Sequence, residues 1–197
     1  MKCSAVVSAA SLLVSSAIAT PLNKREGLSA SDATIITQAA LDWQANTRAV
    51  SAFLDAAAAI LSVEQEGVTV DIRGLAATAL DHEINELQQK GDLENQACAV
   101  DTNCQDTIQG FESLFSAKTQ LESGTFQGVV DQLTALTGDA GTNFDSIRTS
   151  IDIINNGPSG RCQGVLTAID QYFSVASDAL GDDSLFGVRA IRPYACT

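Results

Sequence analysis

The chain has 197 residues, of which 24 are acidic, 11 are basic and one is a histidine, and its formal net charge at pH 7 is −13. Phosphate backbones and anionic lipid surfaces repel so acidic a chain, so nucleic-acid binding is disfavoured and no nucleic-acid partner is expected. Aromatic residues make up only 5% of the sequence. This content is low for a secreted hydrolase that grips sugars or peptides.

The N-terminal region predicts export. Lys2 precedes an apolar run from Ala5 to Ala19, and Ala17 and Ala19 form a small-x-small site for signal peptidase. The run is shorter than the roughly 20 residues of a membrane-spanning helix, and no later segment is long and apolar enough. We expect a signal peptide over residues 1–19, no transmembrane segment and a secreted, extracellular protein, with cell-wall association as an option.

A dibasic pair, Lys24-Arg25, follows the expected cleavage site and resembles the site of the fungal Golgi processing protease. This similarity implies a propeptide over 20–25 and a single mature domain over 26–197. The mature chain would hold 8 basic and 24 acidic residues, for a net charge of −16. The acidic residues are spread along the chain, as on a solvated surface.

The mature chain would keep four cysteines, which in an exported protein predict two disulfides. Three pairings are open, and we favour Cys98–Cys104 around a short polar loop and Cys162–Cys196, which ties the tail to the start of the last helix. A zinc site is disfavoured because no C-x₂-C unit occurs.

The first helix is expected to begin at Ser31 or Asp32 and to end before Gly67. Apolar or small residues recur along it at steps of three and four, which places them on one face. They are Ile36, Ala40, Trp43, Thr47, Val50, Leu54, Ala57 and Leu61.

A second helix is expected from about Val70 to Lys90, with Gly91 as its left-handed C-terminal cap. Its predicted apolar face consists of Ile72, Leu75, Ala76, Ala79, Leu80, Ile84 and Leu87.

Four further helices are predicted by the same spacing. The third starts at a cap among residues 101–103 and ends at Gly124, and the fourth closes at Gly138. The fifth starts at Thr142 or Asn143 and stops at Asn156-Gly157-Pro158, and the sixth covers about 159–180 before a short tail. The expected fold is therefore all-α: an antiparallel bundle of five or six amphipathic helices stapled by two disulfides.

The sequence offers no catalytic constellation, and we expect no enzyme, no cofactor and no metal. His82 is the only histidine, and it begins the pattern H-E-x-x-E, which places His82 and Glu86 one helical turn apart. A metalloprotease would need at least a third ligand and a general base. We interpret the stretch as an acidic, solvated helix face.

Glu83 falls near the centre of the apolar face of the second helix, where a carboxylate is costly unless it is paired or solvated. The plain interpretation is an exposed last turn and a half of that helix. The alternative is a polar anchor inside an apolar ligand cavity.

Several aromatic residues fall on or beside the apolar faces and are expected in the core. Some could instead line a tunnel between helices, because Ala56–Ala59 would leave room for a guest. With Glu83, the candidate ligand-binding residues are Trp43, Phe53, Phe111, Phe115 and Phe173.

The signal peptide, the Ala- and Ser-rich helices and the segments 50–54 and 126–133 resemble the hydrophobic-surface-binding proteins, which include fungal cell-wall mannoproteins. The resemblance covers about residues 30–180. It implies a helical bundle that adsorbs to hydrophobic solids or encloses fatty acids, whereas the four cysteines and the dibasic site depart from it.

The sequence therefore predicts a secreted, non-catalytic protein that binds a lipid or a hydrophobic surface. The alternative is a secreted effector or cell-wall-associated interaction protein that acts on a host or a competitor. A lipid carrier would need an apolar cavity between helices, whereas surface adsorption would need an exposed apolar patch.

Overall fold

The computed structural model describes residues 28–63, 68–99, 111–158, 160–181 and 183–196, and within these ranges the side chains of 96–99, 111–115 and 183 are left out. The described residues contain helices and no strand, which confirms the all-α prediction. The α-helices are α1 (Ala30–Ser62), α2 (Arg73–Ala99), α3 (Phe111–Gln120), α4 (Phe126–Leu136), α5 (Phe144–Asn156) and α6 (Leu166–Leu180). Short π-helical or 3₁₀ segments are η1 (Leu121–Thr125), η2 (Asp139–Thr142), η3 (Arg161–Val165), η4 (Asp183–Leu185) and η5 (Tyr194–Cys196).

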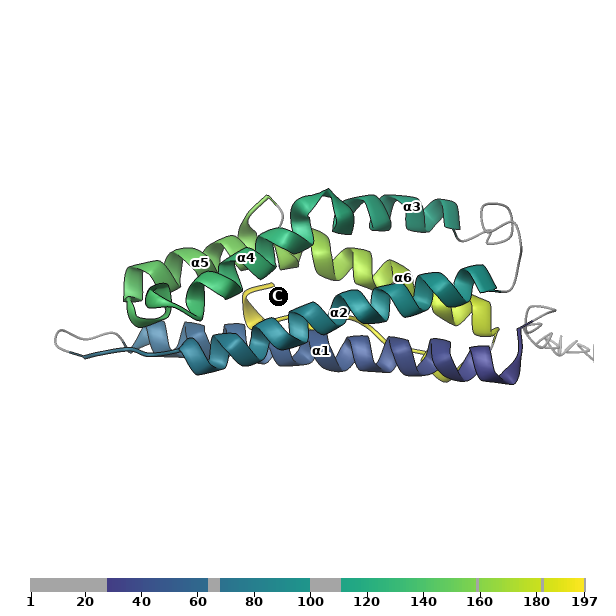
Figure 1. The fold of residues 1–197 in the computed structure, drawn as a ribbon, viewed down its shortest axis with the longest axis horizontal. Coiled ribbons are helices and arrows are strands. Elements are labelled where there is room, and N and C mark those ends of the chain that lie inside the picture. The colour runs from purple at the N-terminus through teal and green to yellow at the C-terminus, as the bar shows by residue number, and fades with distance from the viewer. Residues whose placement is uncertain (1–27, 64–67, 100–110, 159, 182, 197) are drawn as a thin grey trace, which may run out of the picture.

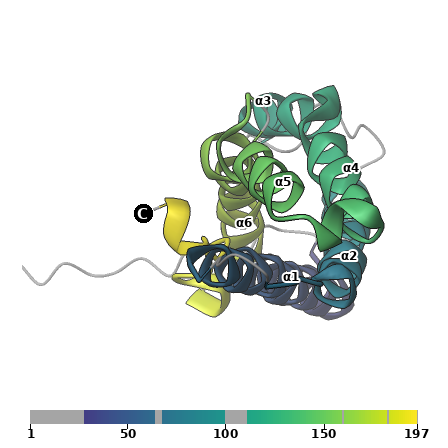
Figure 2. The ribbon, with the colours of Figure 1, turned by 90° about the vertical axis from the view of Figure 1, so that its left-hand side faces the viewer.

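The two long helices, α1 and α2, run antiparallel and pack along one side of the molecule (Figure 1). Helix α4 packs on α2, and α5 and α6 pack on α1, whereas α3 packs on α6 (Figure 2). None of the helices in the described ranges has the length and hydrophobicity needed to cross a bilayer.

Helix α1 behaves as its sequence predicts. Its start is fixed by a capping box in which Asp32 N–H donates to Ser29 Oγ at 3.1 Å, and Ser29 N–H donates back to Asp32 Oδ2 at 3.3 Å. The cap is thus Ser29, two residues before the first predicted one. The predicted apolar face is buried from Ile36 to Ala57.

Helix α2 departs from its prediction in length and in orientation. It continues through Gly91 to Ala99, so Gly91 is a helix interior residue and not a cap. Its buried face contains charged residues, and several predicted core residues face outwards. The buried positions advance by steps of three and four and are Ala76, Ala79, Glu83, Glu86, Lys90 and Leu93, whereas Leu75, Ile84 and Leu87 are about half exposed.

The other boundaries agree well with the predicted turn signals. Gly124 has a φ of +91°, a left-handed conformation that glycine adopts without strain, and it separates α3 from α4. Asn143 caps α5 by accepting a hydrogen bond from Ser146 N–H at 2.9 Å. The predicted start of the third helix at 101–103 lies outside the described residues.

Residues 188–196 form a strap along the side of α1 that faces away from α2 (Figure 2). Gln44 Nε2 donates to Arg189 O at 2.9 Å, Ile191 N–H donates to Thr47 Oγ1 at 3.0 Å, and Tyr194 N–H donates to Asp55 Oδ1 at 2.8 Å. On the other side, Asp170 of α6 accepts from Ala190 N–H and Arg192 Nη2, each at 2.7 Å.

A disulfide closes the end of the strap. Cys162 and Cys196 are bonded with their Cα atoms 5.0 Å apart, which confirms this predicted pairing. The predicted Cys98–Cys104 bond, the signal peptide cut at Ala19 and the dibasic site at Lys24-Arg25 lie outside the described side chains.

Candidate functional site

Four side chains, Trp43, Glu83, Glu86 and Arg161, form an ion-pair cluster inside the bundle. Arg161 comes from η3, directly before α6, and its guanidinium pairs with both glutamates of α2. Its Nη1 donates to Glu83 Oε2, and its Nη2 donates to Glu86 Oε1 at 3.2 Å. Trp43 Nε1 of α1 donates to Glu86 Oε2 at 3.0 Å. The cluster therefore connects three helical elements.

The charges of this cluster are removed from water. Glu83, Glu86 and Arg161 have no exposed surface. Burial raises the pKa of Glu83 to about 8, with Arg161 opposing the shift and the charge of Glu86 adding to it. Burial also raises the pKa of Glu86. One guanidinium can neutralise only one of the two carboxylates, so the burial of both favours the protonated form of the other.

These positions correct two sequence interpretations. Glu83 is neither in an exposed last turn nor a lone anchor in an apolar cavity, because α2 runs 16 residues beyond it and Arg161 pairs with it. Glu86 is likewise not on a solvated face. A buried charge pair needs both partners, so the cluster fixes which face of α2 points inwards.

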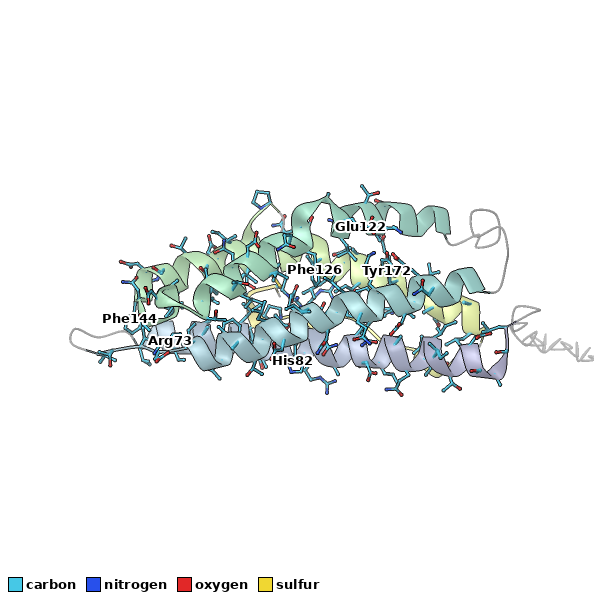
Figure 3. All side chains as sticks on the ribbon, viewed as in Figure 1. Arg73, His82, Glu122, Phe126, Phe144 and Tyr172 are labelled. Carbon is cyan, nitrogen blue, oxygen red and sulfur yellow. A yellow bond between two sulfur atoms is a disulfide. The ribbon has the colours of Figure 1, made fainter. Side chains whose placement is uncertain are left out.

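The cluster does not have the features of a catalytic or metal centre. His82 Nδ1 is 2.9 Å from Asn46 Oδ1, at the seam between α1 and α2 (Figure 3), and not with Glu86. Over the part of the chain that the structure describes, no three His, Cys, Asp or Glu side chains are placed to hold a metal ion. The two glutamates have raised pKa values, but their burial keeps a dissolved substrate from reaching them in this conformation.

The aromatic candidates divide into two groups. Trp43, Phe53 and Phe173 are buried in the core, and the ring centroid of Trp43 lies 5.9 Å from that of Phe173 and 5.3 Å from that of Tyr172. The side chains of Phe111 and Phe115 lie outside the described ones. Trp43 thus contacts these rings and also belongs to the ion-pair cluster, through its hydrogen bond to Glu86.

A second charged cluster connects α2 to η1 and α6. Lys90 Nζ lies 2.8 Å from Glu94 and 2.9 Å from Glu122, and Tyr172 Oη donates to Glu94 at 2.6 Å. Burial disfavours the charge of Lys90, but the hydrogen bonds to both glutamates outweigh it and raise the lysine pKa. Figure 3 shows Glu122 and Tyr172 near each other, close to the middle of the bundle. These contacts extend the charged inner face of α2 towards its C-terminus.

Sequence reasoning missed Arg161. A signal was present, because a carboxylate at the centre of an apolar face requires a cation and the expected mature chain has only eight basic residues. Spacing alone could not select Arg161 among them, since 78 residues separate it from Glu83.

The exchange of faces on α2 leaves an apolar outer stripe, which we define as Leu80, Ile84 and Leu87. These residues follow each other at steps of four and three, so they lie on one side of the helix. Ile84 is 48% exposed, Leu87 is 47% exposed and Leu80 is partly buried. The outer stripe is a candidate contact surface for apolar material.

A scan against protein-family models finds no matching family, and searches of curated proteins and of solved structures find no match either.

Proposed function

We propose that this chain is a secreted, non-catalytic protein that binds hydrophobic surfaces through the outer stripe of α2. The observation that carries the proposal is the reversed orientation of α2, which buries Glu83 and Glu86 and leaves Ile84 and Leu87 half exposed. Long aliphatic side chains in a row along a straight helix suit a flat apolar surface, which they can contact together.

A surface is favoured over a guest inside the bundle. Trp43 and Phe173, which were candidates for lining a tunnel, pack against each other and are almost completely buried. The pair of Glu83 and Arg161 lies among the helices that would enclose the guest. An acyl chain there would have to displace hydrogen-bonded charges, at a cost of several kcal/mol.

Other features fit a secreted protein of this kind. The Cys162–Cys196 disulfide is suited to an oxidising compartment. The proposal retains the signal peptide, the dibasic cut, the second disulfide between Cys98 and Cys104 and a bundle of five or six helices. It also retains the resemblance to hydrophobic-surface-binding proteins and to cell-wall mannoproteins.

The test compares adsorption of the wild type and two charge variants to polystyrene beads. Ile84→Glu with Leu87→Glu places two charges on the outer stripe, and Ile35→Glu with Ile153→Glu places two charges on α1 and α5 at residues that are 37% and 40% exposed. About half of each of the two aliphatic side chains is available to contact the bead, and burying that area contributes about 2 kcal/mol to adsorption. The stripe variant loses this contribution and should adsorb roughly 30-fold more weakly.

The control variant should adsorb within a few-fold of the wild type. Equal losses in both variants would contradict a role for the outer stripe, and adsorption that neither variant reduces would contradict surface binding through α2. Circular dichroism of both variants checks that the helices are retained.

A further inference from the structure

A hollow of about 210 Å³ lies between the C-terminal half of α6 and the turn that leads into the strap. One wall comes from α6, where positions 174, 177 and 178 share a face. The other comes from residues 185–189. The lining includes Ser174, Ser177, Asp178, Phe186, Gly187 and Arg189.

The turn that forms the outer wall is held in place. Leu185 and Val188 are buried in the core on either side of it, and Val188 N–H donates to Leu185 O at 3.0 Å. Gly187 has a φ of +77°, which the turn requires and which a side chain would strain. Beyond the turn, Gln44 Nε2 donates a hydrogen bond to the backbone carbonyl of Arg189. The hollow therefore exists before any ligand arrives.

The turn places an aromatic ring in water at the rim of this hollow. Phe186 is 85% exposed, the highest value among the large hydrophobic residues described. Its neighbours Leu185 and Val188 anchor the turn, so the exposure of the ring follows from an ordered backbone. An ordered, exposed ring next to polar side chains is a surface for a ligand with both an apolar face and hydrogen-bonding groups.

The polar groups indicate a ligand without net charge. Arg189 would attract a carboxylate or a phosphate, but Asp178 lines the same hollow and would repel it. A ligand with several hydroxyl groups can form hydrogen bonds with both Asp178 and Arg189, because a hydroxyl donates to a carboxylate and accepts from a guanidinium. Ser174 and Ser177 add hydroxyls that donate or accept.

We propose that this hollow binds one sugar residue of a neutral glycan, with the Phe186 ring against the C–H face of the sugar and Asp178 and Arg189 on its hydroxyls. A pyranose combines the two properties that the lining requires: one face of C–H bonds and a rim of adjacent hydroxyls. This site is separate from the outer stripe of α2, so it goes beyond surface adsorption and does not depend on it.

The experiment is a titration of the full mature chain, ¹⁵N-labelled, with laminarihexaose, chitohexaose and mannohexaose, followed by amide chemical shifts and calorimetry. We expect one of these probes to shift the amides of residues 174–178 and 185–189. Phe186→Ala and Asp178→Ala should each weaken its binding at least tenfold. Tyr194→Ala removes an aromatic residue that is 82% exposed but does not line the hollow, and it should leave the affinity within twofold.

The assignment is overturned if none of the three probes shifts these amides at millimolar concentration, or if Phe186→Ala binds as the wild type does. Binding of octanoate at the same amides, with no response to the oligosaccharides, would overturn the neutral-sugar assignment in favour of an anion. The variant with Ile84→Glu and Leu87→Glu should bind the sugar normally, so the failure of one proposal is distinguishable from the failure of the other.

Discussion

Replacing Glu83 by glutamine should stabilise the protein at pH 8 and leave its stability nearly unchanged at pH 4.5. Glutamine resembles the protonated carboxyl in shape and, like it, carries no charge. In the folded chain the pKa of Glu83 lies near 8, against 4.5 for the ordinary side chain. Between these values the folded state holds a proton that the unfolded state has released. The free energy of unfolding of the wild type must therefore fall as the pH rises through this window.

The magnitude follows from the number of protons. A difference of one bound proton changes the free energy of unfolding by about 1.4 kcal/mol per pH unit. Over the window between the two pKa values, the wild type should lose on the order of 4–5 kcal/mol. The raised pKa of Glu86 acts in the same direction. The glutamine variant has no proton to lose at position 83, so its stability should decline much less.

The assay is urea denaturation followed by circular dichroism at half-unit steps from pH 4.5 to 8.5. An Asp131→Asn variant serves as the control, since this carboxyl lies on the exposed side of α4. The control should keep the pH dependence of the wild type. A Glu83→Gln variant that is less stable than the wild type at pH 8 would refute the reasoning, because it would show that Arg161 requires the ionised form of Glu83.

Three further predictions concern the same contacts. Arg161→Met should destabilise the fold by about 3–5 kcal/mol at pH 7, because it leaves a buried carboxylate without its cation. The loss should be smaller at pH 4.5, because the lower pH favours the neutral form of that carboxyl. Urea denaturation at both pH values checks this, and an equal loss at both would contradict it. Trp43→Phe should lower the free energy of unfolding by about 1–3 kcal/mol, because Glu86 Oε2 loses its hydrogen-bond donor. Unfolding is followed by circular dichroism, because Trp43 is the single tryptophan and the variant has no tryptophan fluorescence. An unchanged stability would contradict the importance of this hydrogen bond. Replacing Cys162 and Cys196 by serine should lower the unfolding free energy by about 2–4 kcal/mol and increase hydrogen exchange in residues 188–196; unchanged exchange there would show that the hydrogen bonds alone hold the strap.

The contrast between α1 and α2 shows how far the sequence predicts this fold. The face of α1 could be predicted because its buried residues are almost all apolar or small, so hydrophobic periodicity and burial agree. On α2 the same rule selected Ile84 and Leu87, which the structure leaves half exposed. Hydrophobic periodicity predicts that a glutamate is exposed. Glu83 and Glu86 are buried instead, because Arg161, which is distant in sequence, pairs with both of them.

The helix breaks and the C-terminal strap show the same division between local and distant information. The breaks at Gly124 and Asn143 follow from local backbone chemistry and were predicted to within a residue. The Cys162–Cys196 pairing followed from their positions beside the last helix. The strap itself could not be predicted, because its backbone is held by Thr47 and other polar side chains of α1, more than 130 residues earlier in the chain. Nothing in the local sequence of this short tail indicates such contacts.

Helix α2 buries its glutamates, and we propose that its aliphatic side chains contact apolar surfaces. Hydroxyl-radical footprinting tests both statements most directly, applied to the protein free in solution and adsorbed on polystyrene beads. Ile84 and Leu87 should be oxidised in solution and protected on the beads, while Ile153 on α5 should react equally in both. Protection of Ile84 and Leu87 already in solution would contradict the orientation of α2, and unchanged reactivity on the beads would contradict the proposed contact surface.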